Sequence, residues 1–200
     1  MDIISYSASS KVSSLEEKIR NKILGKGVEG KNLNIDERIT SIEKVVEGLN
    51  SKANQLILND SINIMKAHAK LNTIAKTKRY RMQNMIFDDF IDASGVDKTK
   101  SDGYFHSITM GYIRPTGPVC TLETITEETD RNPSKAILTV EESGTGQSSY
   151  LISRDNGGTW ETIFPDKLFY FDDKISLGGN MIRIKIILKS TLLSYGLTWS

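Results

Sequence analysis

Apolar residues at alternating spacings of four and three constrain this chain more than any other feature of its sequence. The run begins at residue 35 and ends at residue 56, and its members are Ile35, Ile39, Ile42, Val46, Leu49, Ala53 and Leu56. This spacing is a heptad seam, in which one narrow apolar stripe of a helix faces a partner helix. A single helix cannot bury such a seam on itself. The sequence therefore predicts that this helix associates with another helix.

Self-association is the simplest source of that partner, because few other segments of the chain carry a matching seam. Isoleucine occupies both core positions of the heptad, as at Ile39 and Ile42, which favours three or more strands over two. Arg38 and Glu43 stand at the flanking positions that pair charges between parallel helices. We predict a homo-oligomer, specifically a trimer, formed through this helix.

The helix is predicted to begin near residue 34 and to continue well beyond the seam. After Leu56 the apolar pattern changes phase and repeats every seven residues, at Ile57, Ile64 and Leu71. This change is equivalent to a four-residue stutter, which locally unwinds a supercoil. No glycine or proline lies between residues 51 and 91, so one long helix is favoured. The alternative is a helical hairpin with its turn at residues 59–61.

Three regions are predicted along the chain. Residues 1–33 form an arm and a short helix that dock on a neighbouring protein, residues 34–87 form the long helix that oligomerises, and residues 88–200 form a sheet domain. Within the first region, Gly25, Gly27 and Gly30 match the glycine pattern of dinucleotide sites. No strand precedes them and no βαβ unit surrounds them, so a flexible joint is the preferred interpretation.

After Gly95 the apolar period changes from 3.6 residues to two, which predicts strands. Strands are expected at 107–112, 119–126, 136–140, 150–152, 182–188 and 193–199, with short ones between them, and the polar residues Arg183 and Lys185 face away from the apolar side. Seven or eight short strands with one apolar face each predict an antiparallel, jelly-roll-like β-sandwich. The predicted fold class is α+β, with the helical and sheet parts segregated.

One hairpin motif is recognisable within the sheet region. Its pattern is S-x-D-x-G-x-T-W, formed by Ser153, Asp155, Gly157, Thr159 and Trp160. It resembles the Asp-box of sialidases and other β-propellers, in which the motif is structural. Each propeller blade needs four strands, so one copy in this length of chain cannot build a propeller. We predict that Asp155 holds a turn and has no catalytic role.

The remaining chemistry-bearing residues do not assemble into a catalytic pattern. They are Cys120, His68, His106, the acidic cluster Asp88, Asp89 and Asp92, and the pairs Glu127–Glu128 and Glu141–Glu142. Cys120 is expected to be a small buried hydrophobe, and the acidic cluster a helix end or surface corner. The sequence predicts no enzyme activity, no cofactor and no metal site.

Charge and hydropathy limit the kinds of binding partner that the chain is expected to have. The net charge is +1, which argues against a generally acidic or basic partner. One helical stretch is locally basic, through Lys66, Lys70, Lys76, Lys78, Arg79 and Arg81. Nucleic acid is one explanation for this stretch, but a solvated helix face whose lysine stems cover apolar surface is favoured. No apolar run approaches the roughly 18 residues of a membrane span, so no membrane insertion is expected.

Several segments between residues 85 and 200 resemble bacteriophage tail and baseplate proteins. The segments are 85–97, which is similar to the junction ahead of a β-sandwich in those proteins, and 150–160, 182–188 and 195–199, which are similar to the ends of such domains. Phage fibres of this kind are commonly trimers. The resemblance implies a structural virion protein, located in the phage tail, baseplate or fibre, whose partners are other virion proteins. Contact with a host-surface glycan is an expected second role, and a carbohydrate-binding accessory module is the alternative.

Overall fold

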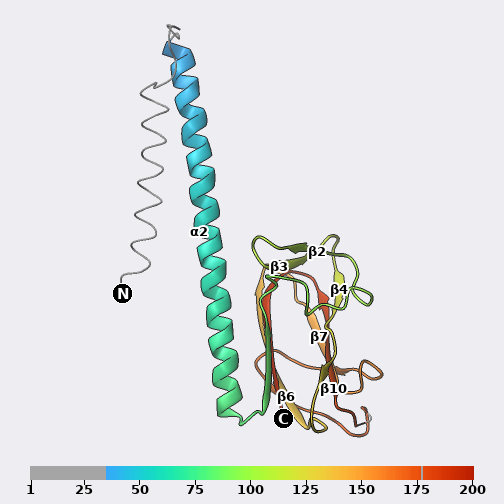
Figure 1. Ribbon diagram of the computed structural model, residues 1–200. Coiled ribbons are helices and arrows are strands. Elements are labelled where there is room, and N and C mark those ends of the chain that lie inside the picture. Colours follow the sequence, from blue (N-terminus) through green and yellow to red (C-terminus); the bar gives the residue numbers. More distant parts are fainter. Residues whose placement is uncertain (1–34, 177) are drawn as a thin grey trace. The chain divides into compact units, whose positions relative to one another are not determined.

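The structure is a computed structural model and describes residues 35–176 and 178–200, with side chains from residue 37 onward. Its elements are α2 (Ile35–Arg79), β1 (Asn84–Asp88), β2 (Tyr104–Ser107), β3 (Tyr112–Pro115), β4 (Cys120–Glu123), β5 (Glu127–Glu128), β6 (Lys135–Ser143), β7 (Ser149–Ser153), β8 (Glu161–Thr162), β9 (Leu168–Tyr170), β10 (Met181–Leu188) and β11 (Thr191–Trp199) (Figure 1). The predicted N-terminal arm and short helix, the glycine pattern at residues 25–30 and the side chain of Ile35 lie outside the described residues.

The helix α2 is continuous over 45 residues. The preference for one long helix is therefore confirmed, and the alternative of a hairpin turning at residues 59–61 is wrong. Residues 59–61 are helical like their neighbours. This agrees with the absence of glycine and proline from this stretch, since those residues are the usual helix breakers.

The helix ends at Arg79, earlier than residue 87, the predicted end of the helical region. Arg81 adopts a left-handed backbone with φ of 51°. Its N–H bonds the carbonyl of Lys78 at 3.3 Å, and the N–H of Met82 bonds the carbonyl of Thr77 at 2.9 Å. These two bonds form a Schellman cap, which normally uses glycine at the left-handed position. Because an arginine takes that position here, the sequence carried no recognisable stop signal.

Residues beyond the cap form a strand where helix was expected. β1 pairs antiparallel with β11, from Asn84 opposite Trp199 to Asp88 opposite Tyr195. The predicted boundary at residues 87 and 88 therefore falls inside a strand. The sheet region begins at Asn84.

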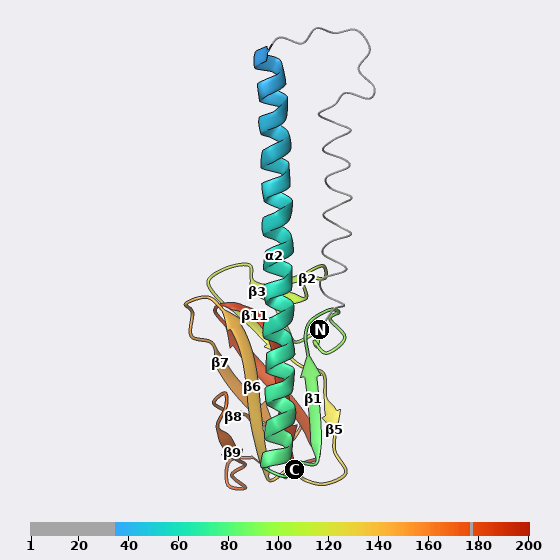
Figure 2. The same ribbon diagram turned by 90° about the vertical axis from the view of Figure 1, so that its left-hand side faces the viewer.

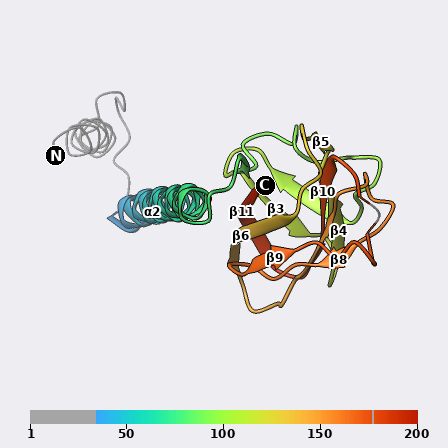
Figure 3. The ribbon, with the colours of Figure 1, turned by 90° about the horizontal axis from the view of Figure 1, so that it is seen from below.

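Two antiparallel sheets carry the rest of the chain, and Figure 3 shows them as two layers that face each other. The first has the order β2-β3-β11-β6-β9, with β1 also paired to β11. The second has the order β4-β10-β7-β8, with β5 also paired to β10. We call this part, residues 84–200, the two-sheet domain. The α+β class is confirmed.

One hydrophobic core joins the two sheets. The first sheet contributes Ile113, Leu138 and Leu197, and the second contributes Ile152 and Ile184, all fully buried. Side chains along these strands point alternately into this core and to the outer face, as the two-residue apolar period of the sequence predicted. Five such aliphatic side chains each contribute roughly 1.5–3 kcal/mol on burial, so this core is the main source of the domain's stability.

The strand predictions hold at β4, β6, β7, β10 and β11 and fail at residues 107–112. The structure places a hairpin turn there, between β2 and β3. Ile108 is 73% exposed, so the apparent alternation of Ile108 with Met110 was fortuitous. Gly111 has a φ of 60°, which a turn accommodates and a strand does not.

A bulge shifts the phase of the last strand. Leu193, Tyr195, Leu197 and Trp199 were predicted to share one side, but the register of β11 against β6 shifts between Leu192 and Ser194. Leu192 joins the core with Tyr195, while Leu193 is buried outside that cluster. An extra residue at a bulge reverses which side chains face inward, and a sequence pattern does not show it.

The last part of α2 belongs to the same compact unit as the sheets. The chain divides into residues 1–57 and residues 58–200. Figure 2 shows the C-terminal half of α2 in front of β6, β11 and β1. Thr73 is fully buried, and a Cβ added at Gly196 of β11 would collide with its side chain. The missing side chain at Gly196 therefore lets helix and strand approach closely, and it explains why both faces of β11 are buried.

Candidate functional site

The predicted oligomerisation seam is exposed on α2. Ile39, Ile42, Val46 and Leu56 are each between 45 and 48% exposed, Ala53 is exposed and Leu49 is half-buried. These large aliphatic side chains recur along the described part of the helix and stand partly in solvent. Arg38 and Glu43, the predicted pairing charges, are exposed as well.

Within residues 58–79 the helix has two distinct faces. Ile62, Lys66, Ala69 and Thr73 are buried and follow a spacing of four, three and four. Ile64 and Leu71 are 69 and 66% exposed. At 100° per residue, Leu71 stands about 160° around the helix from Ala69 and Thr73. One face therefore packs on the two-sheet domain of its own chain, and the opposite face carries the phase-shifted apolar stripe.

The basic stretch of the helix contributes to that packing. The Lys66 ammonium donates to the carbonyls of Asp89 at 2.7 Å and Met110 at 3.0 Å. Lys76 donates to Thr139 and pairs with Asp166, and Lys70 lies over the Phe87 ring. Burial lowers the pKa of Lys66, and the nearby carboxylates of Asp89 and Asp88 oppose that shift. Three of the six basic side chains thus hold the helix on the domain.

The Asp-box hairpin is built around the side chain of Asp155. One carboxylate oxygen accepts from the backbone N–H of Thr159 at 2.9 Å and from the Ser153 hydroxyl at 2.6 Å, and the other accepts from the Thr159 hydroxyl at 2.7 Å. These hydrogen bonds outweigh the effect of burial, so the pKa of Asp155 is lowered. Gly157 takes a φ of 87°, which permits the turn. Asp155 thus satisfies the turn backbone, as in the motif it resembles.

Trp160 packs beneath the same hairpin. A Cβ added at Gly157 would stand 3.0 Å from its ring, and the Lys185 ammonium lies 4.3 Å from the ring centroid. The distance to Lys185 is within the range of a cation–π contact. The tryptophan is therefore half-buried against its own chain.

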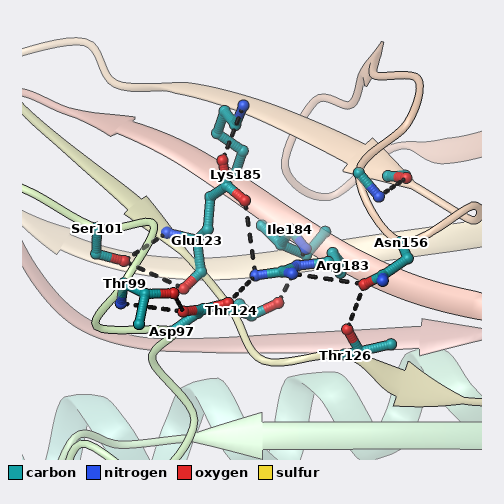
Figure 4. A network of polar contacts seen from close by, with 12 residues as sticks. Asp97, Thr99, Ser101, Glu123, Thr124, Thr126, Asn156, Arg183, Ile184 and Lys185 are labelled. Carbon is teal, nitrogen blue, oxygen red and sulfur yellow. Dashed lines mark hydrogen bonds and ion pairs between the residues drawn. The ribbon is translucent and has the colours of Figure 1, made fainter.

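A polar network links this hairpin to Asp97 and Thr99, in the segment that leads to β2, as Figure 4 shows. Arg183 pairs with Asp97 at 2.6 Å and contacts Glu123 at 3.6 Å, and Glu123 pairs with Lys185 at 2.9 Å. Arg183 also donates to Asn156 of the hairpin at 3.4 Å. The Thr99 hydroxyl and Arg183 lower the pKa of Asp97 to about 2. Arg183 was predicted on an outward face, but it is 3% exposed, because a charge can be buried where carboxylates pair with it.

The cysteine and the histidines are separated in the structure. Cys120 is buried in the core as expected, and burial raises the pKa of its thiol to about 11. His68 is exposed on α2, while Nε2 of His106 lies 2.7 Å from the carbonyl of Phe90. The pair at residues 141 and 142 lies on β6, where Glu142 accepts from the hydroxyls of Tyr150 and Ser190.

The acidic cluster forms a surface corner and not a helix end, which were the two predicted alternatives. Asp88 ends β1, and one oxygen of Asp88, Asp89 and Asp92 each accepts the backbone N–H two residues ahead. Phe90 sits in the corner with a φ of 56° and is buried against Tyr195, with ring centroids 5.9 Å apart. Among the residues that the structure describes, no three histidine, cysteine or carboxylate side chains gather as a metal site.

A pocket of about 390 Å³ opens beside this corner, and sequence reasoning missed it. Its walls are Ile86, Phe87, Asp88, Asp89, Asp92, Ser94, Gly95, Ile125, Glu127 and Tyr195. These residues come from β1, its following corner, the segment around β5 and β11. The acidic run was visible in the sequence, but nothing in it indicated that Glu127 and Tyr195 would stand beside it.

Within residues 35–176 and 178–200, no helix is both long enough and apolar enough to span a bilayer. No known family model matches the chain, and no curated protein resembles it at a significant level.

Proposed function

We propose that this chain is a structural protein of a bacteriophage tail, baseplate or fibre. It associates through α2, as a trimer, and presents the two-sheet domain as a jelly-roll-like β-sandwich for virion assembly. Contact between that domain and a host-surface glycan is a second role. The chain acts in the virion and by assembly, without catalysis.

The exposed apolar seam of α2 is the observation that carries this proposal. Aliphatic side chains that are about half-exposed cost free energy in water, and burying the rest of each contributes roughly 1 kcal/mol. Isoleucine at both core positions favours a three-stranded coil. Many such side chains along one helix offset the roughly 4–15 kcal/mol that association costs.

The two faces of the second half of α2 support an arrangement of that trimer. Ala69 and Thr73 pack on the helix's own two-sheet domain, and Ile64 and Leu71 are exposed on the other side. A coil that uses the exposed face would place the three helices at the centre and the three domains around them. The domain surfaces would then remain available to other virion proteins.

The phage assignment rests on the resemblance of residues 85–97 and of the later strand segments to tail and baseplate proteins. In the structure these residues form β1, its corner, the Asp-box hairpin and the central strands β10 and β11. β10 and β11 lie inside their sheets, whereas the corner and the Asp-box hairpin lie at the surface. The resemblance in β10 and β11 supports the proposal best.

Oligomeric state is the direct test of self-association. Multi-angle light scattering on the full chain at micromolar concentration should give three times the 22.3 kDa of one chain. Ile42→Asp should dissociate the assembly, because each copy would place an uncompensated carboxylate at the axis. Ser41→Asp, one residue away and off the seam, should leave the mass unchanged. A native chain that is monomeric under these conditions refutes the proposal.

The virion location needs a separate test. An antibody raised against residues 84–200 should label the tail or baseplate of particles of the phage that encodes the chain, as seen by electron microscopy. Labelling absent from intact and disrupted particles alike would contradict the assignment to a virion, whatever the oligomeric state.

A carbohydrate-binding module is the alternative, and exposed aromatic rings favour it. Phe164 and Tyr170 of the two-sheet domain are 60 and 65% exposed, and sugars commonly stack on such rings. A glycan array probed with the monomeric Ile42→Asp variant would distinguish the two functions. Glycan binding that is lost in Phe164→Ala or Tyr170→Ala would favour the module.

A further inference from the structure

The pocket beside β1 is strongly acidic. Four of its lining residues carry carboxylates, namely Asp88, Asp89, Asp92 and Glu127, and no lysine or arginine lines it. Burial raises the pKa of Asp88 and of Glu127, because removal from water disfavours their charged forms. A ligand that enters this pocket therefore meets a concentrated negative field.

One buried oxygen of the pocket lacks a partner, and it lies beside Tyr195. Tyr195 is 97% buried, since only 3% of it is exposed, and it lines the pocket. Oδ2 of Asp88 is buried without a partner among the described residues, although Oδ1 accepts the N–H of Phe90 at 2.8 Å. Buried polar groups are nearly always hydrogen-bonded, so the unpartnered Asp88 oxygen requires an explanation.

The two groups are neighbours. A Cβ built on Gly95 would collide with Asp88 Oδ2 and would lie 3.9 Å from the Tyr195 hydroxyl. Asp88 and Glu127 are also the two charges that, after burial, raise the pKa of Tyr195. The three acceptors Asp88, Glu127 and Tyr195 thus surround the same space.

The nearest basic groups of the chain are held elsewhere. The Lys66 ammonium is bonded to the carbonyls of Asp89 and Met110, and His106 lies against the carbonyl of Phe90. Both contacts fix the backbone of the corner, and the Lys66 ammonium also attracts Asp89 and Asp88, so these two of the four carboxylates are compensated in part. The corner is held in place, because the buried Phe90 packs on Tyr195. Such a site is already formed before a ligand arrives.

The chemistry favours an organic cation over a metal ion. No set of three metal-ligating side chains is gathered in the part of the chain that the structure describes. The walls include Ile86, Phe87 and Ile125, which suit an aliphatic stem better than a hydrated ion. An alkylammonium has three N–H donors, and the pocket offers three acceptors with spare capacity.

We propose that this pocket binds a primary alkylammonium group, with Asp88, Glu127 and Tyr195 as hydrogen-bond acceptors and Ile86 and Ile125 against the stem. Two sources share this chemistry: a lysine side chain of a neighbouring protein, and a free polyamine. The inference does not depend on the proposed function, because every residue in it lies in one two-sheet domain.

Calorimetric titration of the full chain tests the proposal with three probes. 1,5-Diaminopentane represents the free amine, acetyl-Gly-Lys-Gly-amide represents the side chain, and the same peptide with norleucine lacks only the ammonium. Both amines should bind and the norleucine peptide should not. Tighter binding of the lysine peptide identifies a protein partner as the source, and tighter binding of the diamine identifies a small molecule.

Matched variants locate the binding. Tyr195→Phe removes only the hydroxyl, and Glu127→Gln removes one charge without changing the shape of the side chain. Each should weaken amine binding about tenfold. Glu128→Gln removes the exposed neighbouring charge on β5 and should leave binding unchanged. Gly95→Ala keeps every charge but crowds Asp88, and it should abolish binding while near-ultraviolet circular dichroism stays native.

Three results would overturn the proposal. The first is that neither amine binds the full chain at millimolar concentration. The second is that Glu128→Gln and Glu127→Gln weaken amine binding equally, which would show that binding depends only on the overall charge of the chain. The third is calcium binding that requires the same residues and excludes the amines, which would assign the pocket to a metal.

Discussion

The Asp155 side chain is the clearest case in which one residue holds a local structure. It accepts three hydrogen bonds inside a single turn, two of them from Thr159. Asp155→Ala should lower the free energy of unfolding by about 1–2 kcal/mol, because these bonds are lost from a partly exposed site. Asp130→Ala, at an exposed position of the same domain, should change it by less than about 0.5 kcal/mol. Urea unfolding of the full chain measures both.

If the native chain cleaves a sialidase substrate and Asp155→Ala does not, a catalytic role replaces this structural one. Equal destabilisation by the two variants would show that the Asp155 hydrogen bonds are unimportant.

The ionised side chain of Asp88 should lower the free energy of unfolding at pH 7. Burial and the neighbours Asp89 and Asp92 raise its pKa in the folded state, while the Phe90 N–H and His106 oppose the shift. Its ionised form therefore destabilises the fold above the folded pKa, and this penalty is relieved as pH falls toward about 4. Asp88→Asn keeps the acceptor for Phe90 and removes the charge. We expect it to unfold at higher urea than the native chain at pH 7, with the difference shrinking by pH 4.

The Lys66 ammonium and the uncharged Tyr195 hydroxyl also face Asp88 across the corner, and neither changes in this variant. An Asp88→Asn protein that is less stable at pH 7 would show that the charge is compensated in the folded chain. The carboxylate would then be structural.

The Asp-box could be predicted from the sequence and the pocket could not, because the contacts of the Asp-box join residues that are close in sequence and those of the pocket do not. The Asp-box was readable because Ser153, Asp155 and Thr159 contact one another within seven residues of sequence. The pocket was not, because Tyr195 reaches Asp88 only through the pairing of β11 with β1. Local hydrogen-bond chemistry leaves a pattern in the sequence, whereas long-range strand pairing leaves almost none.

At the scale of elements, the long helix and the central strands were predictable and the helix end was not. The Schellman cap on an arginine at residue 81 removed the expected glycine signal. The residues after it, in β1, were assigned to the helix because no breaker intervened. The bulge at Leu193 in β11 is a second local event without a sequence signature.

The contact between α2 and β11 depends on one glycine. A Cβ at Gly196 would collide with the side chain of Thr73, which is fully buried. Gly196→Ala should lower the free energy of unfolding by about 1–3 kcal/mol, the usual cost of overpacking. Gly117→Ala is the matched control, because a Cβ there meets nothing within 4 Å. Urea unfolding followed by tryptophan fluorescence measures both.

The double variant Gly196→Ala with Thr73→Ala separates this contact from a general strand effect. Thr73→Ala removes the hydroxyl and methyl that the new Cβ would strike. The double variant should therefore lose less free energy of unfolding than the sum of the two single variants. Strictly additive losses would show that helix and strand do not press on each other at this point.

At the scale of the whole molecule, the helix cannot be assigned to one part of the chain. A division at residues 87 and 88 was predicted, because the helical and strand periods hardly overlap in sequence. By its contacts, the second half of α2 groups with the sheets, in a compact unit of residues 58–200. The second half of α2 has polar anchors, such as Lys66 and Thr73, on its domain-facing side, so hydrophobic periodicity alone did not reveal that side.

This division gives a sharp prediction for fragments. Residues 58–200 retain the packed half of α2 and β1, and they should unfold cooperatively with near-native circular dichroism. Residues 88–200 lack both, which leaves the β1 edge of β11 unpaired and the face around Gly196 in water. An unpaired central edge of this kind invites aggregation. We expect the shorter fragment to be insoluble, or to unfold at much lower urea than the longer one. Equal midpoints would mean that the two sheets form a domain without the helix, as the sequence periods alone suggested.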